Sequence, residues 1–214
     1  MAAHPRAPAG YVRHLFDQFS ADYDRRMVDE LSYRAPMILR QLADLLLAPE
    51  KRSLAILDLG CGTGLAGASF ADLACRLDGV DLSPRMIACA RQRGIYDVLD
   101  IGDLETILGT GAGTYDLILA ADTFVYLGDL CPAFTGAHRR LTPQGHLFFT
   151  VEKASEGFYS LGEKRRYRHS EAYLRSEAEG AGFEIMGMMD CSPRAEAGMP
   201  VAGLAVALQR RNAA

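Results

Sequence analysis

A glycine-rich turn at residues 60–64 constrains the possible folds of this chain more than any other stretch. Its sequence is Gly-Cys-Gly-Thr-Gly, and it follows the apolar run 54–57, Asp58 and Leu59. A short apolar run that ends at glycines is typical of a buried parallel strand, and the apolar spacing after the turn is helical. Glycines leave the backbone open to a ligand, and a helix start offers free N–H groups. The stretch therefore predicts a strand, a turn and a helix that together bind a nucleotide-type cofactor.

Strands and helices alternate along the rest of the chain. The expected strands are 54–59, 76–81, 96–101, 115–121, 146–152, 183–190 and 201–209. The expected helices are 64–75, 84–92, 103–108, 129–141 and 170–180, and the segments 154–168 and 191–200 are expected to be irregular connections. This alternation predicts an α/β, Rossmann-like fold with a mostly parallel sheet and helices on both faces. Because no helix separates the last two strands, one edge strand is expected to be antiparallel.

The residues before the first strand have no place in that sheet. Residues 1–10 contain prolines and a glycine and are expected to form a disordered tail. Residues 11–50 follow a helical pattern, in which Phe16, Phe19 and Tyr23 share one face. We expect this segment to be a lid on a single domain that spans residues 51–210. Packing of the aromatic face on the sheet edge is the alternative.

Composition excludes several classes of protein. The 214 residues suit one domain, and the net charge of -4 comes without a basic stripe, which argues against a nucleic-acid partner. No apolar run approaches the roughly 20 residues that span a bilayer, so no membrane partner is expected. Five scattered cysteines without a C-x-x-C motif indicate neither a metal site nor a disulfide framework. Free thiols favour a cytoplasmic location.

Three aspartates near the glycine turn narrow the kind of ligand that this site is expected to bind. Asp81 ends the second strand, where a carboxylate can accept both hydroxyls of a ribose; a partner for the next helix is the alternative. Asp103 follows the third strand and can accept from an adenine amino group while Leu104 N–H donates to the ring, and it can also cap a helix. Asp58 can hold a cationic amine at a position where a dinucleotide phosphate would be repelled. Together they favour a cationic amino-acid nucleoside.

Four motifs, in order along the chain, resemble those of class I S-adenosylmethionine-dependent methyltransferases. They are residues 56–64 (ILDLGCGTG), 79–83 (GVDLS), 115–118 (YDLI) and 141–145 (LTPQG). The resemblance covers nearly the whole chain and implies a seven-stranded sheet in the order 3-2-1-4-5-7-6, with strand 7 antiparallel. It also implies the methyl donor S-adenosylmethionine, with S-adenosylhomocysteine as the product.

The same resemblance implies where the cofactor binds. Its amino-acid end would contact residues 60–62, its ribose Asp81, and its adenine Leu82, Leu104 and Asp103, while Ala121 would lie beneath the sulfonium. The full set of implied cofactor-binding residues is Tyr23, Arg34, Asp58, Gly60, Cys61, Gly62, Gly64, Asp81, Leu82, Met86, Asp103, Leu104 and Ala121.

A narrower resemblance links the chain to methyltransferase domains that are often fused to tetratricopeptide repeats. It is carried by residues 16–24, 31–36, 166–170 and 193–203. The sequence itself has no 34-residue period, so the repeats are not part of it. This resemblance implies that Tyr33 and Arg34 reach the cofactor carboxylate, since a guanidinium pairs well with a carboxylate.

The acceptor site is expected after strand four and in segments that fold over it. Residues 121–124 differ from the motif typical of nucleic-acid amino-group methyltransferases, which argues against base methylation. His169 is a candidate general base, with a surface or capping histidine as the alternative, and Tyr126 can equally be a core aromatic. The candidate catalytic residues are His169 and Tyr126, and the candidate substrate contacts are Phe16, Phe19, Asp122, Tyr126 and Tyr167.

These features predict a methyltransferase that acts by in-line displacement on a small-molecule or protein acceptor. We expect it to be metal-independent and a monomer or homodimer. The G-x-G-x-x-G match at residues 62–67 also fits a short NAD-dependent oxidoreductase, although no Tyr-x-x-x-Lys motif accompanies it. A cofactor-binding module without turnover is a third possibility, because no catalytic residue is unmistakable.

Overall fold

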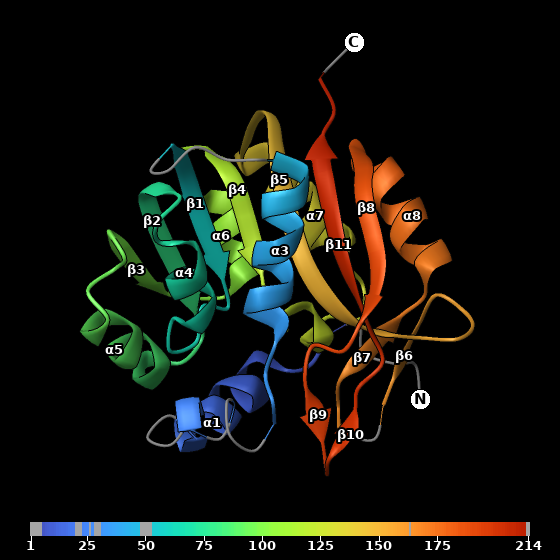
Figure 1. Ribbon diagram of the computed structural model, residues 1–214, viewed down its shortest axis with the longest axis horizontal. Helices are drawn as coiled ribbons and strands as arrows, with labels where there is room; N and C mark the ends of the chain where they lie inside the picture. Colours follow the sequence, from blue (N-terminus) through green and yellow to red (C-terminus); the bar gives the residue numbers. More distant parts are fainter. Residues whose placement is uncertain are drawn as a thin grey trace.

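A central sheet runs through the computed structural model of the chain, which describes residues 6–19, 23–25, 27, 31–47, 53–162 and 164–212. Seven strands follow one another across the sheet in the order β3-β2-β1-β4-β5-β11-β8 (Figure 1). Their bounds are β1 Leu54–Leu59, β2 Ala74–Asp81, β3 Val98–Ile101, β4 Tyr115–Ala120, β5 Leu141–Lys153, β8 Phe183–Cys191 and β11 Gly203–Arg210. The first five pair in parallel, and β11 is antiparallel to both β5 and β8. The implied order 3-2-1-4-5-7-6 is confirmed.

Helices cover both faces of this sheet. Their bounds are α1 Ala9–Phe19, α2 Tyr23–Arg25, α3 Ala35–Leu47, α4 Leu65–Phe70, α5 Pro84–Gln92, α6 Leu104–Thr110, the 3-10 helix η3 Phe124–Tyr126, α7 Cys131–Arg140 and α8 Glu171–Gly180. None of the helices in the described ranges has the length and apolar character needed to cross a membrane.

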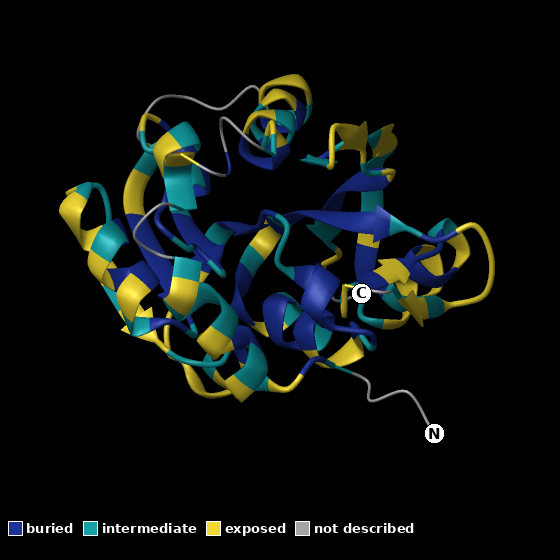
Figure 2. Ribbon diagram, turned by 90° about the horizontal axis from the view of Figure 1, so that it is seen from below, coloured by how far each residue is buried: buried dark blue, intermediate teal, exposed yellow. Residues whose placement is uncertain are grey.

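The core forms two layers because strand residues alternate between the faces. On β4, Leu117 and Leu119 pack with α3 and α4, whereas Ile118 packs on the opposite side with residues of α6, α7 and α8. On β5, Phe148 and Phe149 divide in the same way. Figure 2 shows the buried strands between helices whose outer sides are exposed. All of these apolar runs are buried on both sides, as expected of a parallel sheet.

The segment 154–168 is not the irregular connection that the sequence predicts. It contains β6 Tyr159–Leu161 and the first two residues of β7 Tyr167–His169. β7 pairs in parallel with the end of β5, at Glu152 and Lys153, and β6 pairs with β7. A second small hairpin, β9 Ala195–Glu196 and β10 Met199–Pro200, lies within the predicted loop 191–200. Strands of two or three residues are too short to show an apolar period, so they depend on pairing with distant parts of the chain.

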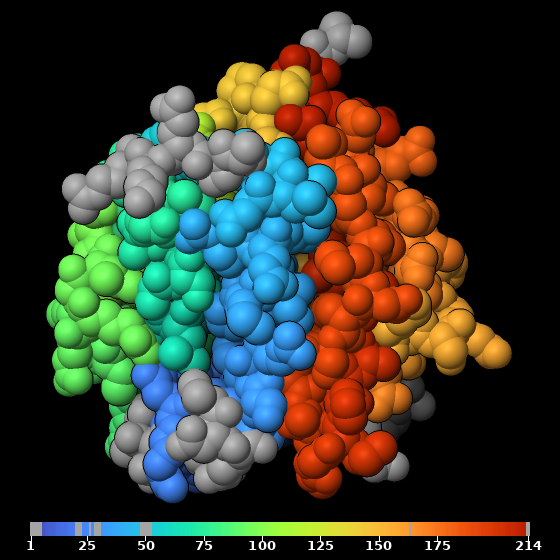
Figure 3. Space-filling model, in the orientation of Figure 1, coloured from blue at the N-terminus to red at the C-terminus, as the bar shows by residue number. Residues whose placement is uncertain are grey.

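The N-terminal residues lie across the end of the sheet where β1 and β4 finish (Figures 1 and 3). The structure differs here from the predicted disordered tail: α1 begins at Ala9, Arg6 forms a bridge with Leu127, and Ala7 N–H donates to Tyr126 O at 2.8 Å. Residues 1–5 lie outside the described residues. These backbone contacts, which local sequence does not reveal, hold residues 6–10 in place.

Candidate functional site

A cavity of about 230 Å³ lies where β1, β2 and β4 end beneath the N-terminal helices. Ligands of open α/β sheets gather at this edge. The cavity wall consists of Arg6, Ala7, Val12, Leu15, Phe16, Phe19, Tyr23, Met27, Leu31, Tyr33, Gly60, Cys61, Gly62, Thr63, Leu65, Ala66, Val80, Asp81, Leu82, Gly102, Asp103, Leu104, Ala121, Asp122, Thr123, Tyr126, Leu127 and Arg166.

The glycine turn has open space for a ligand beside one of its glycines, Gly62. Gly60, Gly62 and Gly64 all have positive φ, which side chains other than glycine rarely adopt. At Gly60 a Cβ atom would come within 2.5 Å of Thr123, so that glycine is required by internal packing. At Gly62 a Cβ atom would meet nothing closer than Tyr23, at 4.0 Å. Gly62 is therefore the glycine that leaves room for a ligand.

The later glycines of the motif, Gly64 and Gly67, leave room for the side chain of Tyr96. A Cβ atom at Gly67 would collide with Tyr96, whose ring lies against the start of α4, and one at Gly64 would come within 2.9 Å of Arg93 and 3.0 Å of Tyr96. The Tyr96 hydroxyl donates to Asp58 Oδ2 at 2.7 Å. The G-x-G-x-x-G spacing thus allows an aromatic ring to pack on α4, a role that needs no diphosphate.

Asp58 is a buried carboxylate with an incomplete set of partners. It is 1% exposed, and its Oδ1 atom has no hydrogen-bond partner among the described residues. Burial raises its pKa to about 6, against the opposing effect of the Tyr96 hydrogen bond. Asp58 does not line the cavity itself; it lies behind the glycine turn and next to Tyr96.

Asp81 connects the second strand to the glycine turn. Its Oδ2 accepts from Gly62 N–H at 2.9 Å, and its Oδ1 accepts from Ser83 N–H at 2.8 Å. A carboxylate has about four acceptor positions, so both oxygens can still accept ribose hydroxyls from the cavity. Burial raises the pKa of Asp81, and these two backbone donors oppose that effect.

Asp103 caps a helix and pairs with the N-terminal segment. Its Oδ1 accepts from Thr106 N–H, as the N-cap of α6, and its carboxylate is bound by Arg6, which also pairs with Glu105. Burial opposes ionisation of Asp103, but Arg6 outweighs it and the pKa is lowered. The predicted helix cap is therefore present, on a carboxylate that also lines the cavity.

Two further contacts attach the N-terminal helices to the cofactor motifs. Asp17 of α1 accepts from Ser83 Oγ at 2.5 Å, and Asp24 of α2 pairs with Thr63 and with Arg93. The aromatic face predicted for this segment lies inward, where Phe16 contacts the rings of Tyr23 and Tyr126 edge to face. Phe16 and Phe19 both line the cavity.

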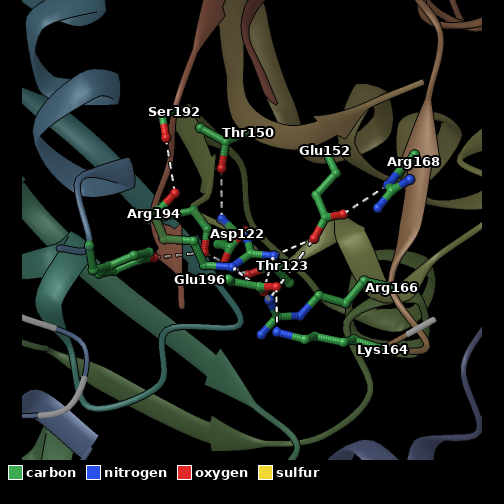
Figure 4. A network of polar contacts seen from close by, with 12 residues as sticks. Asp122, Thr123, Thr150, Glu152, Lys164, Arg166, Arg168, Ser192, Arg194 and Glu196 are labelled. Atoms are coloured by element: carbon green, nitrogen blue, oxygen red, sulfur yellow. Dashed lines mark hydrogen bonds and ion pairs between the residues drawn. The ribbon is translucent and has the colours of Figure 1, made fainter. Parts of the chain in front are cut away.

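A network of charged side chains closes the other end of the cavity (Figure 4). Arg194, at 1% exposure, pairs with Asp122 at 2.5 Å, with Glu152, and with Glu196 at 3.2 Å. Asp122 lies two residues after the end of β4 and has a positive φ of 55°. Burial raises the pKa of Asp122, while the charges of Arg194 and Arg166 lower it. We call these residues, together with Lys164, Arg166 and Arg168, the Arg194 network.

His169 does not lie where a general base would be needed. It is fully buried on β7, with Nε2 3.2 Å from Gly128 O and its ring stacked on Tyr173 at 5.7 Å. Burial lowers its pKa to about 4. His169 and the neighbouring Tyr167 are both outside the cavity wall, and Tyr167 packs on Gly128 and Tyr159. The predicted catalytic role of His169 and substrate contact of Tyr167 are therefore corrected, because their strand pairs with β5 and turns both into the core.

The cavity brings together most of the residues singled out from the sequence. Those in its wall are Phe16, Phe19, Tyr23, Gly60, Cys61, Gly62, Asp81, Leu82, Asp103, Leu104, Ala121, Asp122 and Tyr126. Those outside it are Arg34, Asp58, Gly64, Met86, Tyr167 and His169. Arg34 is exposed and its backbone N–H donates to Pro193 O, so the structure does not support its predicted carboxylate contact. Tyr33 does line the cavity, and its hydroxyl donates to Ala121 O at 3.2 Å.

Sequence reasoning assigned no role to three arginines of this region. Arg6 falls in the segment predicted to be disordered, and nothing local marks it. Arg166 and Arg194 belong to the motifs that carry the narrower resemblance, so a signal was present. The sequence did not reveal the pairing of β7 with β5 or the β9–β10 hairpin. These two features place the side chains of Arg166 and Arg194 beside Asp122 (Figure 4).

In the part of the chain that the structure describes, no three His, Cys, Asp or Glu side chains gather so that they could hold a metal ion. Two open features of the cavity concern the cofactor instead: the room above Gly62 and the spare acceptor positions of Asp81. Both fit a ligand with a ribose and an extended chain.

Comparison with known proteins finds methyltransferases that are similar to part of this chain. Residues 57–149 match a family model described as a methyltransferase domain. Methyltransferase-like protein 27 of Homo sapiens is 36% identical over 120 residues, which cover 55% of this chain and 49% of that protein. A malonyl-[acyl-carrier protein] O-methyltransferase of Enterobacter lignolyticus is 30% identical over 147 residues, 65% of this chain and 57% of that protein. The chain spans about half the length of the curated relatives it matches.

Solved structures share the fold over nearly the whole chain. The N-methyltransferase NodS of Bradyrhizobium japonicum, solved with S-adenosyl-L-homocysteine, superposes with a TM-score of 0.74 at 20% identity, over 94% of this chain and 98% of that one. Residues 57–149 are therefore similar to the methyltransferase-domain family, and the chain shares the fold of a methyltransferase that was solved with S-adenosyl-L-homocysteine.

Proposed function

We propose that this chain transfers a methyl group from S-adenosylmethionine to a small-molecule or protein acceptor, without a metal. The charge of the cavity wall carries this proposal. Its described charged residues are Asp81, Asp103 and Asp122 against Arg6 and Arg166, an excess of one negative charge. A cationic sulfonium is favoured in such a cavity, whereas the two phosphates of NAD would be repelled.

The packing of the glycine motif supports the same choice. Gly64 and Gly67 lie beneath the ring of Tyr96, and α4 has only 6 residues. In a dinucleotide site the second glycine of the motif lets the backbone approach the pyrophosphate, and the third allows close packing of helix and strand. Here the side chains of Arg93 and Tyr96 lie against the second glycine, Gly64, which argues against the NAD-dependent alternative.

We propose contacts in the cavity wall for the nucleoside part of the cofactor. We assign the ribose hydroxyls to Asp81, the adenine to the space beside Leu82 and Leu104, and its amino group to Asp103. When bound, S-adenosylmethionine supplies an electrophilic methyl group on a sulfonium. The protein then has to align the acceptor and exclude water, and no covalent nucleophile is required. The Tyr33 hydroxyl holds Ala121 O at 3.2 Å, at the point where β4 ends.

The acceptor side is the less specific part of the proposal. Small-molecule and protein acceptors are both compatible with an apolar wall of Val12, Leu15, Phe16 and Phe19. The malonyl-[acyl-carrier protein] relative takes an acceptor attached to a protein, according to its name. We further propose that the N-terminal segment is a lid, because α1 carries Phe16 and Phe19 into the cavity wall.

Titration calorimetry tests the cofactor. We expect S-adenosylmethionine and S-adenosylhomocysteine to bind and NAD to give no heat. Binding of NAD alone would contradict the proposal. Release of S-adenosylhomocysteine is then measured against a panel of acids, phenols, amines and peptides, with and without EDTA. Tight cofactor binding with persistent silence would favour the module without turnover, and a loss of activity in EDTA would refute metal independence.

A further inference from the structure

The acceptor end of the described cavity wall offers only weak general bases. The predicted base, His169, lies outside the wall. Burial raises the pKa of the Tyr33 and Tyr126 phenols, so both keep their protons at neutral pH. Asp122 pairs with Arg194 at 2.5 Å, which makes its carboxylate a weaker base. A hydroxyl acceptor has to lose a proton to a base, whereas the lone pair of a neutral amine can react without one.

The enclosed part of the Arg194 network has more negative than positive groups. It consists of two guanidinium groups and three carboxylates, those of Arg166, Arg194, Asp122, Glu152 and Glu196. The side chains of the other two cations are more than half exposed, so water screens their charges. Arg166, which lines the cavity, is already paired with Glu196 at 2.6 Å and lies 4.0 Å from Glu152. The network therefore favours a positive ligand group beside it over a negative one.

Asp122 carries this excess charge to the cavity. It lines the cavity wall, and its Oδ1 accepts from Arg194 (Figure 4). Among the described residues no other donor contacts its carboxylate, so Oδ2 can accept from a ligand. Glu152 and Glu196 each have a further cation besides Arg194, whereas Asp122 shares Arg194 with both of them. Of the three carboxylates, Asp122 is thus the least neutralised and the one in the described cavity wall.

The cavity wall near Asp122 is aromatic. The ring centre of Phe16 lies 6.1 Å from that of Tyr23 and 5.6 Å from that of Tyr126, at interplanar angles of 65° and 82°. Burial raises the pKa of both phenols, and the charge of Asp122 adds to this rise. The Tyr126 ring already has one cation, Arg166, 6.0 Å from its centre. Uncharged rings at steep angles near a carboxylate suit an alkylated ammonium group.

From these observations we propose that the methyl acceptor is an amine, whose nitrogen lies beside Asp122 Oδ2. This acceptor class rests on the proposed function and makes it more specific. The amine reacts as the free base: its lone pair forms the N–C bond to the methyl group, and the C–S bond breaks with its electron pair kept by sulfur. The positive charge passes from sulfur to nitrogen and stays in the negative cavity. Methylation of a carboxylate or a phenolate would instead bring an anion to that wall and remove the positive charge.

Titration calorimetry with the full chain, saturated with S-adenosylhomocysteine, tests this preference for a cation. The probes have nearly the same shape and different charges: choline, its uncharged isostere 3,3-dimethylbutan-1-ol, and the anion 3,3-dimethylbutanoate. Choline is expected to bind on the order of 10-fold more tightly than the alcohol, as for a cation near aromatic rings and a carboxylate. The anion is expected to bind most weakly.

Two variants identify the groups responsible. Asp122→Asn keeps the shape of the side chain but removes its charge, and should bring the affinities for choline and the alcohol to within about threefold of each other. Phe16→Leu removes an aromatic ring and should weaken choline by about 3- to 10-fold, with little effect on the alcohol. Asp44→Asn is the matched control, because its carboxylate is 53% exposed, pairs with Arg40 and lies outside the cavity wall. Binding of S-adenosylhomocysteine shows that each variant is folded.

Three results would overturn the assignment of an amine. One is choline binding no more tightly than its uncharged isostere. Another is a preference for choline that Asp122→Asn leaves unchanged or that Asp44→Asn reduces equally. A third is turnover with S-adenosylmethionine that is faster with acids or phenols than with the matched amines. In each case binding of S-adenosylhomocysteine by the unchanged protein leaves the proposed methyl donor standing, whereas its absence there would refute both.

Discussion

Replacing Asp58 by Asn should stabilise the cofactor-free protein at neutral pH and weaken its cofactor site. The carboxylate is 1% exposed and receives a hydrogen bond from Tyr96, while Oδ1 has no partner among the described residues. An ionised carboxylate in this position is costly, and burial accordingly raises the pKa of Asp58 from 3.8 to about 6. The amide of Asn carries no charge and can still accept from the Tyr96 hydroxyl.

The shift of the pKa gives both the size and the sign of the effect. A rise of about two units corresponds to about 3 kcal/mol of unfolding free energy, at about 1.4 kcal/mol per unit. Because the folded state holds the proton more tightly, Asp58 stabilises the fold below about pH 4, and this contribution is lost as the pH rises through about 6. The side-chain N–H groups that Asp58→Asn introduces need new partners, so we expect a net gain of about 1–2 kcal/mol at pH 8.

Urea unfolding of both proteins from pH 4 to pH 8, without cofactor, measures this difference. The advantage of Asp58→Asn should be largest at pH 8 and disappear toward pH 4. A constant difference across this range, or a variant less stable than the parent at pH 8, would refute the assigned cost of burying the charge. Calorimetry with S-adenosylhomocysteine should show weaker binding to the variant, because a negative charge behind the glycine turn is lost.

Four other substitutions, one of them a control, test separate parts of the structure. Arg194→Met should lower the unfolding free energy by about 3–5 kcal/mol in urea, since three carboxylates lose their shared cation, whereas the exposed Arg168→Met should cost less than about 1 kcal/mol. Ser170→Ala removes the N-cap of α8, whose hydroxyl accepts from Tyr173 N–H at 3.2 Å, and should cost about 1 kcal/mol in thermal unfolding. Burial lowers the pKa of His169 to about 4, so His169 should destabilise the fold by up to about 3 kcal/mol as the pH falls from 6.5 to 4. His169→Phe should remove this pH dependence of the unfolding free energy. A variant with the same pH profile as the parent would contradict the assigned cost of protonating His169.

The cofactor end of the site could be predicted because it is built from local motifs. Gly62, Asp81 and Asp103 each follow a strand, and the carboxyl ends of parallel strands meet at one edge of the sheet. Only the strand order was needed to bring them together, and the resemblance to class I methyltransferases implied that order, whereas the alternation of strands and helices predicted the mostly parallel sheet. At Asp103 the predicted helix cap is present and the carboxylate also lines the cavity, while its contact with an adenine amino group stays a prediction.

Contacts between distant short segments could not be predicted in the same way. His169 precedes a helix in the sequence, which favoured a surface or cavity position. Three residues, Tyr167–His169, extend the sheet beside β5, and this pairing carries the histidine into the core. Likewise Asp58 was placed against the cofactor because it precedes the glycines, whereas Tyr96, 38 residues later, lies next to it and covers it.

The two ends of the cavity therefore differ in how the chain builds them. The cofactor end depends on β1, β2 and β3 and the turns that follow them, whereas the acceptor end depends on α1, the β6–β7 hairpin and the β9–β10 hairpin. The Arg194 network joins the two hairpins to Asp122, and α1 contacts the β6–β7 hairpin where the Arg165 guanidinium lies 5.2 Å from the centre of the Tyr11 ring. Because the buried Arg194 holds the β9–β10 hairpin to β5, substitutions on the cavity side of the hairpins can alter the acceptor wall while the glycine turn keeps its own contacts. Variation among relatives with one methyl donor and different acceptors is expected to concentrate in these segments, since the packing of Gly60, Gly64 and Gly67 leaves the turn little freedom to change.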